Sequence, residues 1–242
     1  MQVLTVLSGK GGTGTTAVAA NLAAVAAMRG ANTLLVDFHN GARALDLAFG
    51  VQDRAIYHTG DVRSGALDLE DAVLRIPGLR HLSLLSGDPD SCCGGPESEA
   101  LDSVGELIRS CARRYDLTVI DAGSGWSPLI KAITAVSDLS LLVTTPDRIA
   151  LRATEALEDR MIRSRVMNRR YLVNRVIPAL VFKGIEPEVQ EINTRIRCEM
   201  AGMVLDDENI RAAMGIGAPV VLKQDSYIAE NFRKIAERLL ML

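Results

Sequence analysis

A glycine-rich stretch near the N-terminus contains the residue types that hold a phosphate group. It reads Ser8-Gly9-Lys10-Gly11-Gly12-Thr13-Gly14-Thr15-Thr16, directly after an apolar run and directly before a helical pattern. Glycines let the backbone adopt left-handed angles and approach an anion closely, so that main-chain amides and a helix N-terminus face it. The Thr16 hydroxyl stands where such loops carry a Mg²⁺ ligand. Taken alone, the stretch also fits a strand–helix turn that binds nothing.

The stretch lacks the lysine that usually completes a phosphate-binding loop. In the pattern GxxxxGK[ST], the lysine position is occupied by Thr15. One charge-assisted contact contributes roughly 1.5–3 kcal/mol, so its loss predicts nucleotide affinity that is weakened about 10–150-fold but not abolished.

Two aspartates end apolar runs elsewhere in the chain. Asp37 follows Thr33–Val36, and Asp121 ends Leu117–Asp121. Carboxyl ends of parallel strands meet at one edge of a sheet, where a carboxylate can reach Mg²⁺ through water. The two aspartates are therefore candidate metal-site residues.

Short apolar runs alternate with longer helical patterns along the chain, which is typical of βαβ units and a mostly parallel sheet. We expect strands at Val3–Leu7, Thr33–Val36, His81–Leu85, Leu117–Asp121, Leu139–Thr144 and Tyr171–Asn174, with a weaker one at Pro219–Leu222. Helices are expected at Thr16–Arg29, Glu97–Arg114, Ile149–Arg163, Pro187–Arg197 and Ser226–Leu240. The sequence thus predicts a single doubly wound α/β domain over residues 1–242, with helices on both faces of the sheet.

The composition excludes several classes of protein. The chain has 242 residues, of which 48% are hydrophobic and 24% charged, and a net charge of -3. These values exclude disordered, collagenous and coiled-coil chains and indicate no global attraction to nucleic acid or anionic lipid. The longest apolar stretch, Ala17–Met28, is too short to span a bilayer.

The four cysteines, Cys92, Cys93, Cys111 and Cys198, form no CxxC pair, so we expect reduced thiols in a cytoplasmic protein. The vicinal Cys92–Cys93 pair is also open to a redox or metal role.

Several further motifs occur in a fixed order. Lys10 follows Gly9 and precedes a double glycine, and Asp37, Gly41, Arg43, Leu45, Asp46 and Leu47 fit the pattern DFDxGLRNLDL. They are followed by Val119–Gly125, Val143-Thr144-Thr145-Pro146, Val173-Asn174-Arg175, Asp206–Ile210 and Gly217–Val221. Together these motifs resemble the MinD/ParA family of deviant Walker A P-loop ATPases, and most closely its MinD branch. The threonine at the lysine position is also similar to the cellulose-synthesis and pilus-localisation branches.

The resemblance implies a site for ATP or ADP with Mg²⁺. Nucleotide would contact Lys10, Gly11, Gly12, Thr13, Gly14, Thr15, Thr16, Gly125, Asn174 and Arg175. The metal would be held by Thr16, Asp37 and Asp121, and the catalytic positions would be Lys10, Asp37 and His39. Lys10 would cross a homodimer interface to the partner's phosphates, while Asn174 would recognise adenine.

Besides Thr15 at the lysine position, two further residues depart from the family's pattern. His39 stands where the family usually has an aspartate that positions water, so it is either a replacement base or a loop histidine without a role, and hydrolysis should be slow or absent. Leu205 replaces a proline beside the adenine, which weakens the expectation of base specificity.

Three functions fit this sequence. The first is a nucleotide-dependent dimerisation switch in spatial regulation, such as septum placement, acting with an unidentified protein partner. The second is a pseudo-ATPase scaffold, and the third is a DNA-bound partitioning ATPase acting through Arg160, Arg163, Arg165, Arg169, Arg170 and Arg175. A solvated helix face is the other interpretation of that run. MinD proteins usually carry a basic amphipathic helix beyond the last one here, so no autonomous membrane anchor is expected.

Overall fold

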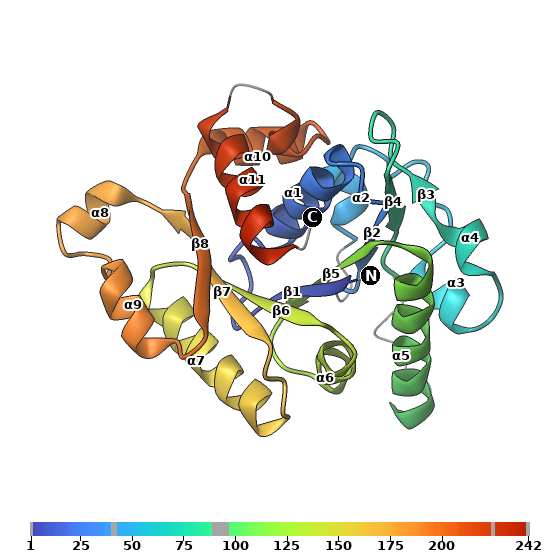
Figure 1. Cartoon of the computed structure of the whole chain (residues 1–242), viewed down its shortest axis with the longest axis horizontal. Helices are drawn as coiled ribbons and strands as arrows, with labels where there is room; N and C mark the ends of the chain where they lie inside the picture. Colours follow the sequence, from blue (N-terminus) through green and yellow to red (C-terminus); the bar gives the residue numbers. More distant parts are fainter. Residues whose placement is uncertain (1, 40–42, 89–96, 224–225, 241–242) are drawn as a thin grey trace.

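The computed structural model describes residues 2–39, 43–88, 97–223 and 226–240 of the chain. One sheet has the strand order β3-β4-β2-β5-β1-β6-β7-β8, and all neighbours in it are parallel except β3 and β4 (Figure 1). The strands are β1 Gln2–Ser8, β2 Thr33–Asp37, β3 Leu74–Arg75, β4 Leu82–Leu85, β5 Leu117–Ser124, β6 Leu139–Thr144, β7 Arg169–Val176 and β8 Glu199–Leu205. This arrangement confirms the predicted α/β class. The predictions for Gly41 and for the Cys92–Cys93 pair lie outside the described residues.

Helices cover both faces of the sheet. The helices α1 and α11 lie on one face, and α5, α6 and α7 lie on the other (Figure 1). The described helices are α1 Thr15–Met28, α2 Leu45–Ala48, α3 Thr59–Arg63, α4 Leu69–Ala72, α5 Glu97–Arg114, α6 Pro128–Ala135, α7 Arg148–Arg163, α8 Pro178–Phe182, α9 Val189–Arg195, α10 Glu208–Gly215, the 3₁₀ helix η1 Val220–Leu222 and α11 Tyr227–Leu239.

The central strand β1 shows why the predicted strands are continuous apolar runs. Leu4 and Val6 belong to the hydrophobic cluster under α1 and α11, whereas Val3 and Leu7 belong to the cluster under α5, α6 and α7. Successive side chains of a strand point to opposite faces, so a strand covered on both sides is apolar at most positions.

The helix α1 is buried on almost every side, which explains its unusual composition. Half of its 14 residues are alanine, and its one amide side chain, Asn21, is fully buried. The Asn21 amide nitrogen donates to the Ala17 carbonyl at 2.8 Å, and its oxygen accepts from the Val221 amide at 3.1 Å. The residue that interrupts the apolar stretch therefore ties α1 to η1.

Two predictions of secondary structure are wrong. Pro219–Leu222, predicted as a strand, contains the 3₁₀ helix η1, whose Val220 and Val221 are buried against the core. The edge strand next to β7 is β8, which the sequence pattern did not predict. The helix predicted over Pro187–Arg197 is shorter, spanning only Val189–Arg195.

Candidate functional site

The glycine-rich loop connects β1 to α1 and requires glycine at its last position. Gly12 and Gly14 have φ angles of 82° and 93°, in the left-handed region. A Cβ atom on Gly14 would lie 2.4 Å from the Asn174 amide nitrogen. That nitrogen donates to the Thr13 carbonyl at 2.8 Å. The end of β7 thus fixes the loop at the N-terminus of α1.

The other end of the loop lies against α7. A Cβ atom on Gly9 would lie 2.3 Å from the Ala153 carbonyl oxygen, so the loop backbone touches the helix directly. The Lys10 Nζ atom lies 3.7 Å from Asp147 Oδ1, and both side chains are 43% exposed. Asp147 also caps α7 by accepting from the Ala150 amide at 2.9 Å. The loop's only lysine is therefore held at the N-terminus of α7.

The loop contains polar groups that have no hydrogen-bond partner among the described residues. Thr13 is 2% exposed, and its hydroxyl has no hydrogen-bond partner among the described residues. The helix α1 begins at Thr15 without a side-chain cap, which leaves its first amides without side-chain acceptors. Buried polar groups are normally paired, and phosphate oxygens would supply acceptors to both. The loop therefore fits a phosphate group.

The two predicted aspartates lie side by side at the carboxyl edge of the sheet. Asp37 and Asp121 are register partners in β2 and β5, and both are fully buried. The Thr16 hydroxyl donates to Asp121 Oδ2 at 2.6 Å, so the third predicted metal ligand joins them. Asp37 accepts hydrogen bonds from the amides of His39 at 2.9 Å, Ala44 at 3.1 Å and Leu45 at 3.2 Å.

The electrostatics of this pair favour a cation. Burial, with the neighbouring Asp121 carboxylate as a smaller cause, raises the pKa of Asp37 to about 6, against the effect of its backbone hydrogen bonds. Burial also raises the pKa of Asp121, although the Thr16 hydrogen bond and the nearby His39 oppose this rise. In the described part of the chain, no group of three His, Cys, Asp or Glu residues could hold a metal by itself. The two carboxylates of Asp37 and Asp121 suit Mg²⁺, which binds through one or two carboxylates together with water and phosphate oxygens.

His39 lies beside the acidic pair. Its Nδ1 atom is 3.9 Å from Asp121 Oδ2 and has no hydrogen-bond partner among the residues described. The ring packs on the end of β5, because a Cβ atom on Gly123 would lie 3.0 Å from His39 Cδ2. The turn that follows β5 is bonded to β1, since the amide of Gly125 donates to the Ser8 carbonyl at 2.8 Å. The structure thus places His39 at the site, within reach of both carboxylate-bearing strands.

Two cavities adjoin the loop. A cavity of about 240 Å³ is lined by Gly14, Thr16, Ala17, Asn174, Arg175, Leu205, Asp206, Asp207, Ile210, Arg211 and Met214. A second, of about 270 Å³, is lined by Lys10, Gly12, Thr13, Thr145, Pro146, Asp147, Arg175, Ile177, Glu186, Asp206 and Arg211. The first brings the predicted base-contacting residues Asn174 and Arg175 next to the loop.

Sequence reasoning missed Arg211, which lines both cavities. The signal that could have found it is its position directly after the Asp206–Ile210 motif.

The comparisons with known proteins agree with this geometry. The profile of the CobQ/CobB/MinD/ParA nucleotide binding domain family matches residues 4–220. The chain belongs to this family. Septum site-determining protein MinD of Thermotoga maritima is 29% identical over 241 residues, covering 98% of this chain and 87% of that protein. MinD of Bacillus subtilis is 27% identical, covering 99% of this chain and 89% of that protein.

Solved structures of the CobQ/CobB/MinD/ParA family share the fold. A chain of the MinC:MinD cell division protein complex of Aquifex aeolicus superposes with a TM-score of 0.89 at 25% identity, covering 99% of this chain and 95% of that chain. MinD of Pyrococcus horikoshii, complexed with Mg-ADP, superposes with a TM-score of 0.84 at 24% identity, covering 99% of this chain and 96% of that chain. This family member is therefore MinD-like along nearly all of its length, which confirms the predicted branch.

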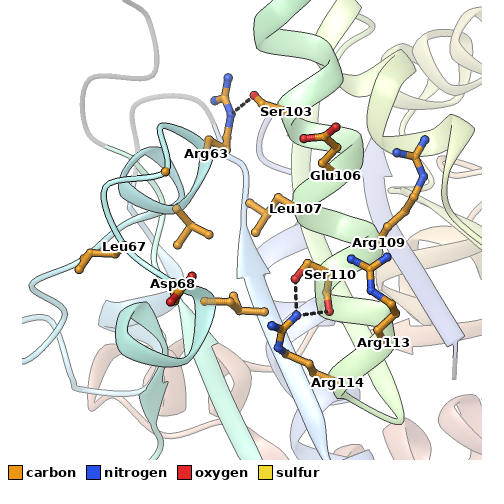
Figure 2. Close-up of a pocket in the computed structure, with 13 residues that line it drawn as sticks. Arg63, Leu67, Asp68, Ser103, Glu106, Leu107, Arg109, Ser110, Arg113 and Arg114 are labelled. Carbon is orange, nitrogen blue, oxygen red and sulfur yellow. Dashed lines mark hydrogen bonds between the residues drawn. The ribbon is translucent and has the colours of Figure 1, made fainter.

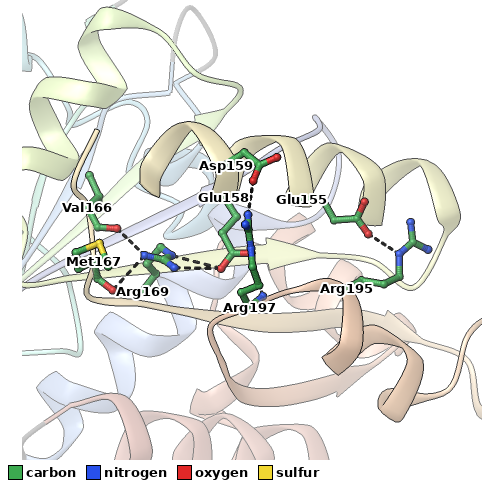
Figure 3. Close-up of polar contacts among 8 residues, drawn as sticks. All are labelled: Glu155, Glu158, Asp159, Val166, Met167, Arg169, Arg195 and Arg197. Atoms are coloured by element: carbon green, nitrogen blue, oxygen red, sulfur yellow. Dashed lines mark hydrogen bonds and ion pairs between the residues drawn. The ribbon is translucent and has the colours of Figure 1, made fainter. Parts of the chain in front are cut away.

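The predicted basic run does not form one free surface. Arg169 is 7% exposed and pairs at 3.3 Å with Glu158, which is fully buried in α7 (Figure 3). Arg170 pairs with Glu199 at 3.1 Å. Arg169 thus connects β7 to α7 and offers little surface to a DNA backbone, while DNA binding through the rest of the run stays a prediction. Within the described ranges, no helix has the length and apolar character needed to cross a membrane.

Proposed function

We propose that this chain is a MinD-like switch that binds ATP or ADP with Mg²⁺, dimerises on the triphosphate form and takes part in positioning the division septum. Residues 1–242 would act as one nucleotide-binding domain. The single observation that carries the proposal is the unpaired Thr13 hydroxyl at an uncapped helix N-terminus, next to two buried carboxylates. The septum site-determining relatives support the cellular role.

The residues of the loop would bind the phosphates through their amides, from Gly11 to Thr16. Mg²⁺ would supply positive charge to the phosphates and to the acidic pair. Thr16 would hold the metal directly, and Asp37 and Asp121 would hold it through water. Asn174 and Arg175 would orient the base in the cavity of about 240 Å³.

Lys10 would act across a homodimer interface. Its side chain is half exposed, and its one ion pair is the exposed contact with Asp147. Such exposed pairs contribute only about 0–1 kcal/mol, so the ammonium can exchange Asp147 for a partner's phosphate at little cost. The relative in the MinC:MinD complex supports the further expectation of a second protein as partner.

Hydrolysis should be slow. His39 lies near Asp121 but lacks the fixed negative charge of a carboxylate, and a general base acts best when its protonation and reach match the attacking water. A neutral imidazole would orient water less firmly than an aspartate at the same position.

The chain's single tryptophan, Trp126, follows the Gly125 turn and provides the assay. Titration with ATP and Mg²⁺ should change its fluorescence with weak affinity, and sedimentation should show a dimer only with the triphosphate. Thr15→Lys should tighten binding by about tenfold or more, because it restores a charge-assisted contact. If neither protein binds ATP at millimolar concentration, the proposed function is wrong.

The second candidate function is a pseudo-ATPase scaffold, favoured by Thr15 and His39 together. ATP turnover that disappears in Asp37→Ala would exclude it. If Thr15→Lys combined with His39→Asp gives no turnover although ATP binds, the scaffold is favoured and the proposed role of position 39 is wrong.

A further inference from the structure

A groove beside α5 lies outside the nucleotide site. It runs between α5 and the α3–α4 segment and has a volume of about 540 Å³ (Figure 2). It is lined by Val62, Arg63, Gly65, Leu67, Asp68, Leu69, Ser103, Glu106, Leu107, Arg109, Ser110, Arg113 and Arg114. None of these residues belongs to the glycine-rich loop or to the acidic pair, so the proposed function does not explain the groove.

The floor of the groove is apolar. Leu69 from α4 and Leu107 from α5 are each 4% exposed and belong to the same hydrophobic cluster. Val62 is partly buried and packs on the same hydrophobic cluster. Leu107 points toward the α3–α4 segment (Figure 2). Because Leu69 and Leu107 expose little surface, the apolar area that a ligand would meet comes mainly from the half-buried Val62 and Leu67.

The rim of the groove is basic. Four arginines and two carboxylates line it, which leaves two positive charges on a chain whose net charge is -3. Arg63 donates to the Ser103 hydroxyl at 3.2 Å, and Arg114 donates to the Ser110 hydroxyl at 2.5 Å (Figure 2). They stand near the two ends of the floor.

Two of the rim arginines have no ion pair within the described residues. These are Arg109 and Arg113, which are exposed and lie one turn apart on α5. Arg114 pairs with Glu70, but that pair is exposed and contributes little, so a partner's carboxylate can replace it. The groove therefore presents at least two cations with unused donors.

We propose that the groove binds an acidic amphipathic helix of a partner protein. From Ser103 to Arg114 the wall formed by α5 is about 16 Å long, which matches about three turns of helix. The apolar stripe of such a helix would lie over the half-buried Val62 and Leu67, above the buried floor. Its carboxylates would accept hydrogen bonds from the arginines, whose planar guanidinium groups suit bidentate contacts. A flat lipid surface would not reach the recessed floor.

The test uses a fluorescein-labelled peptide of about 14 residues with leucines at i, i+3, i+4 and i+7 and glutamates elsewhere. Fluorescence anisotropy should show salt-sensitive binding to the wild-type chain. The charge reversal Arg109→Glu with Arg113→Glu should weaken binding by about tenfold or more. Ser110→Phe, which fills the groove without changing its charge, should also weaken it.

The matched control is Arg160→Glu with Arg163→Glu, which makes the same charge change on exposed residues in the last turn of α7. It should leave binding unchanged, and circular dichroism should show all variants folded. Equal affinity of the wild type and the groove variants would overturn the proposal, as would equal binding of a peptide with glutamine in place of glutamate. Binding to anionic vesicles that depends on Arg109 and Arg113, without peptide binding, would assign the rim to a membrane surface instead.

Discussion

The buried carboxylate of Asp37 should make the stability of the metal-free protein fall as pH rises. Burial and the neighbouring Asp121 raise its pKa from 3.8 to about 6, so the folded protein holds this proton to higher pH than the unfolded chain does. A group with a raised pKa stabilises the folded state at low pH and loses this effect as pH passes the folded value. The full shift corresponds to about 3 kcal/mol, of which about 2 kcal/mol develops between pH 4.5 and 7.5.

The perturbation is Asp37→Asn, which removes the charge and keeps the shape. Urea unfolding, followed by Trp126 fluorescence and circular dichroism in EDTA, gives the free energy of unfolding at each pH. The wild type should lose about 2 kcal/mol relative to the variant across that range. Asp53→Asn, at an exposed position, should follow the wild type. Mg²⁺ with ADP should reduce the difference, because the cation offsets the repulsion. Parallel pH profiles for wild type and Asp37→Asn would refute this account of the acidic pair.

Two substitutions test the geometry around the site. Gly14→Ala should abolish the nucleotide-induced change in fluorescence and destabilise the fold by more than Gly30→Ala does. Both glycines have φ near 90°, but only at Gly14 would the new Cβ atom collide with a neighbour, Asn174. Equal losses of stability in the two variants would show that only backbone strain matters. Arg169→Ala should lower the free energy of unfolding by about 1.5–3 kcal/mol, because it removes one of the two arginines that pair with the buried Glu158 carboxylate and leaves Arg197 in place. Arg170→Ala should lower it by about 0–1 kcal/mol, because its pair with Glu199 is exposed. Urea unfolding of both arginine variants measures this, and equal losses would contradict the buried ion pair.

The central strands and the acidic edge of the sheet could be predicted from the sequence because local pattern and tertiary environment agree there. Strands β1, β2 and β5 are covered on both faces, so they are mostly apolar, with the buried threonines Thr5, Thr33 and Thr118 among the apolar residues, until a polar residue marks the end. The glycines of the loop and the aspartates Asp37 and Asp121 follow directly from those ends. Asp37 and Asp121 lie side by side because β2 and β5 pair in parallel, and the alternation of strands and helices indicated such pairing.

The edge of the sheet could not be predicted in this way. The strand β8 begins with an exposed glutamate and contains Gly202, where a Cβ atom would lie 2.7 Å from Ile235 Cγ1, so its composition reflects close packing by α11 instead of strand propensity. Val220–Leu222 has strand composition because it packs on the core, but it does so in a single 3₁₀ turn. The contacts of Lys10 with Asp147 and of Arg211 with both cavities depend on tertiary placement, which no local pattern encodes.

The direct backbone contact at Gly9 has a mechanical consequence. With no side chain between the loop and the Ala153 carbonyl, there is no compressible layer to absorb a displacement. Any widening of the loop's first turn must push α7 along with it, and a force applied to the outer surface of α7 must be felt by the loop. The loop and α7 therefore move together as one rigid unit.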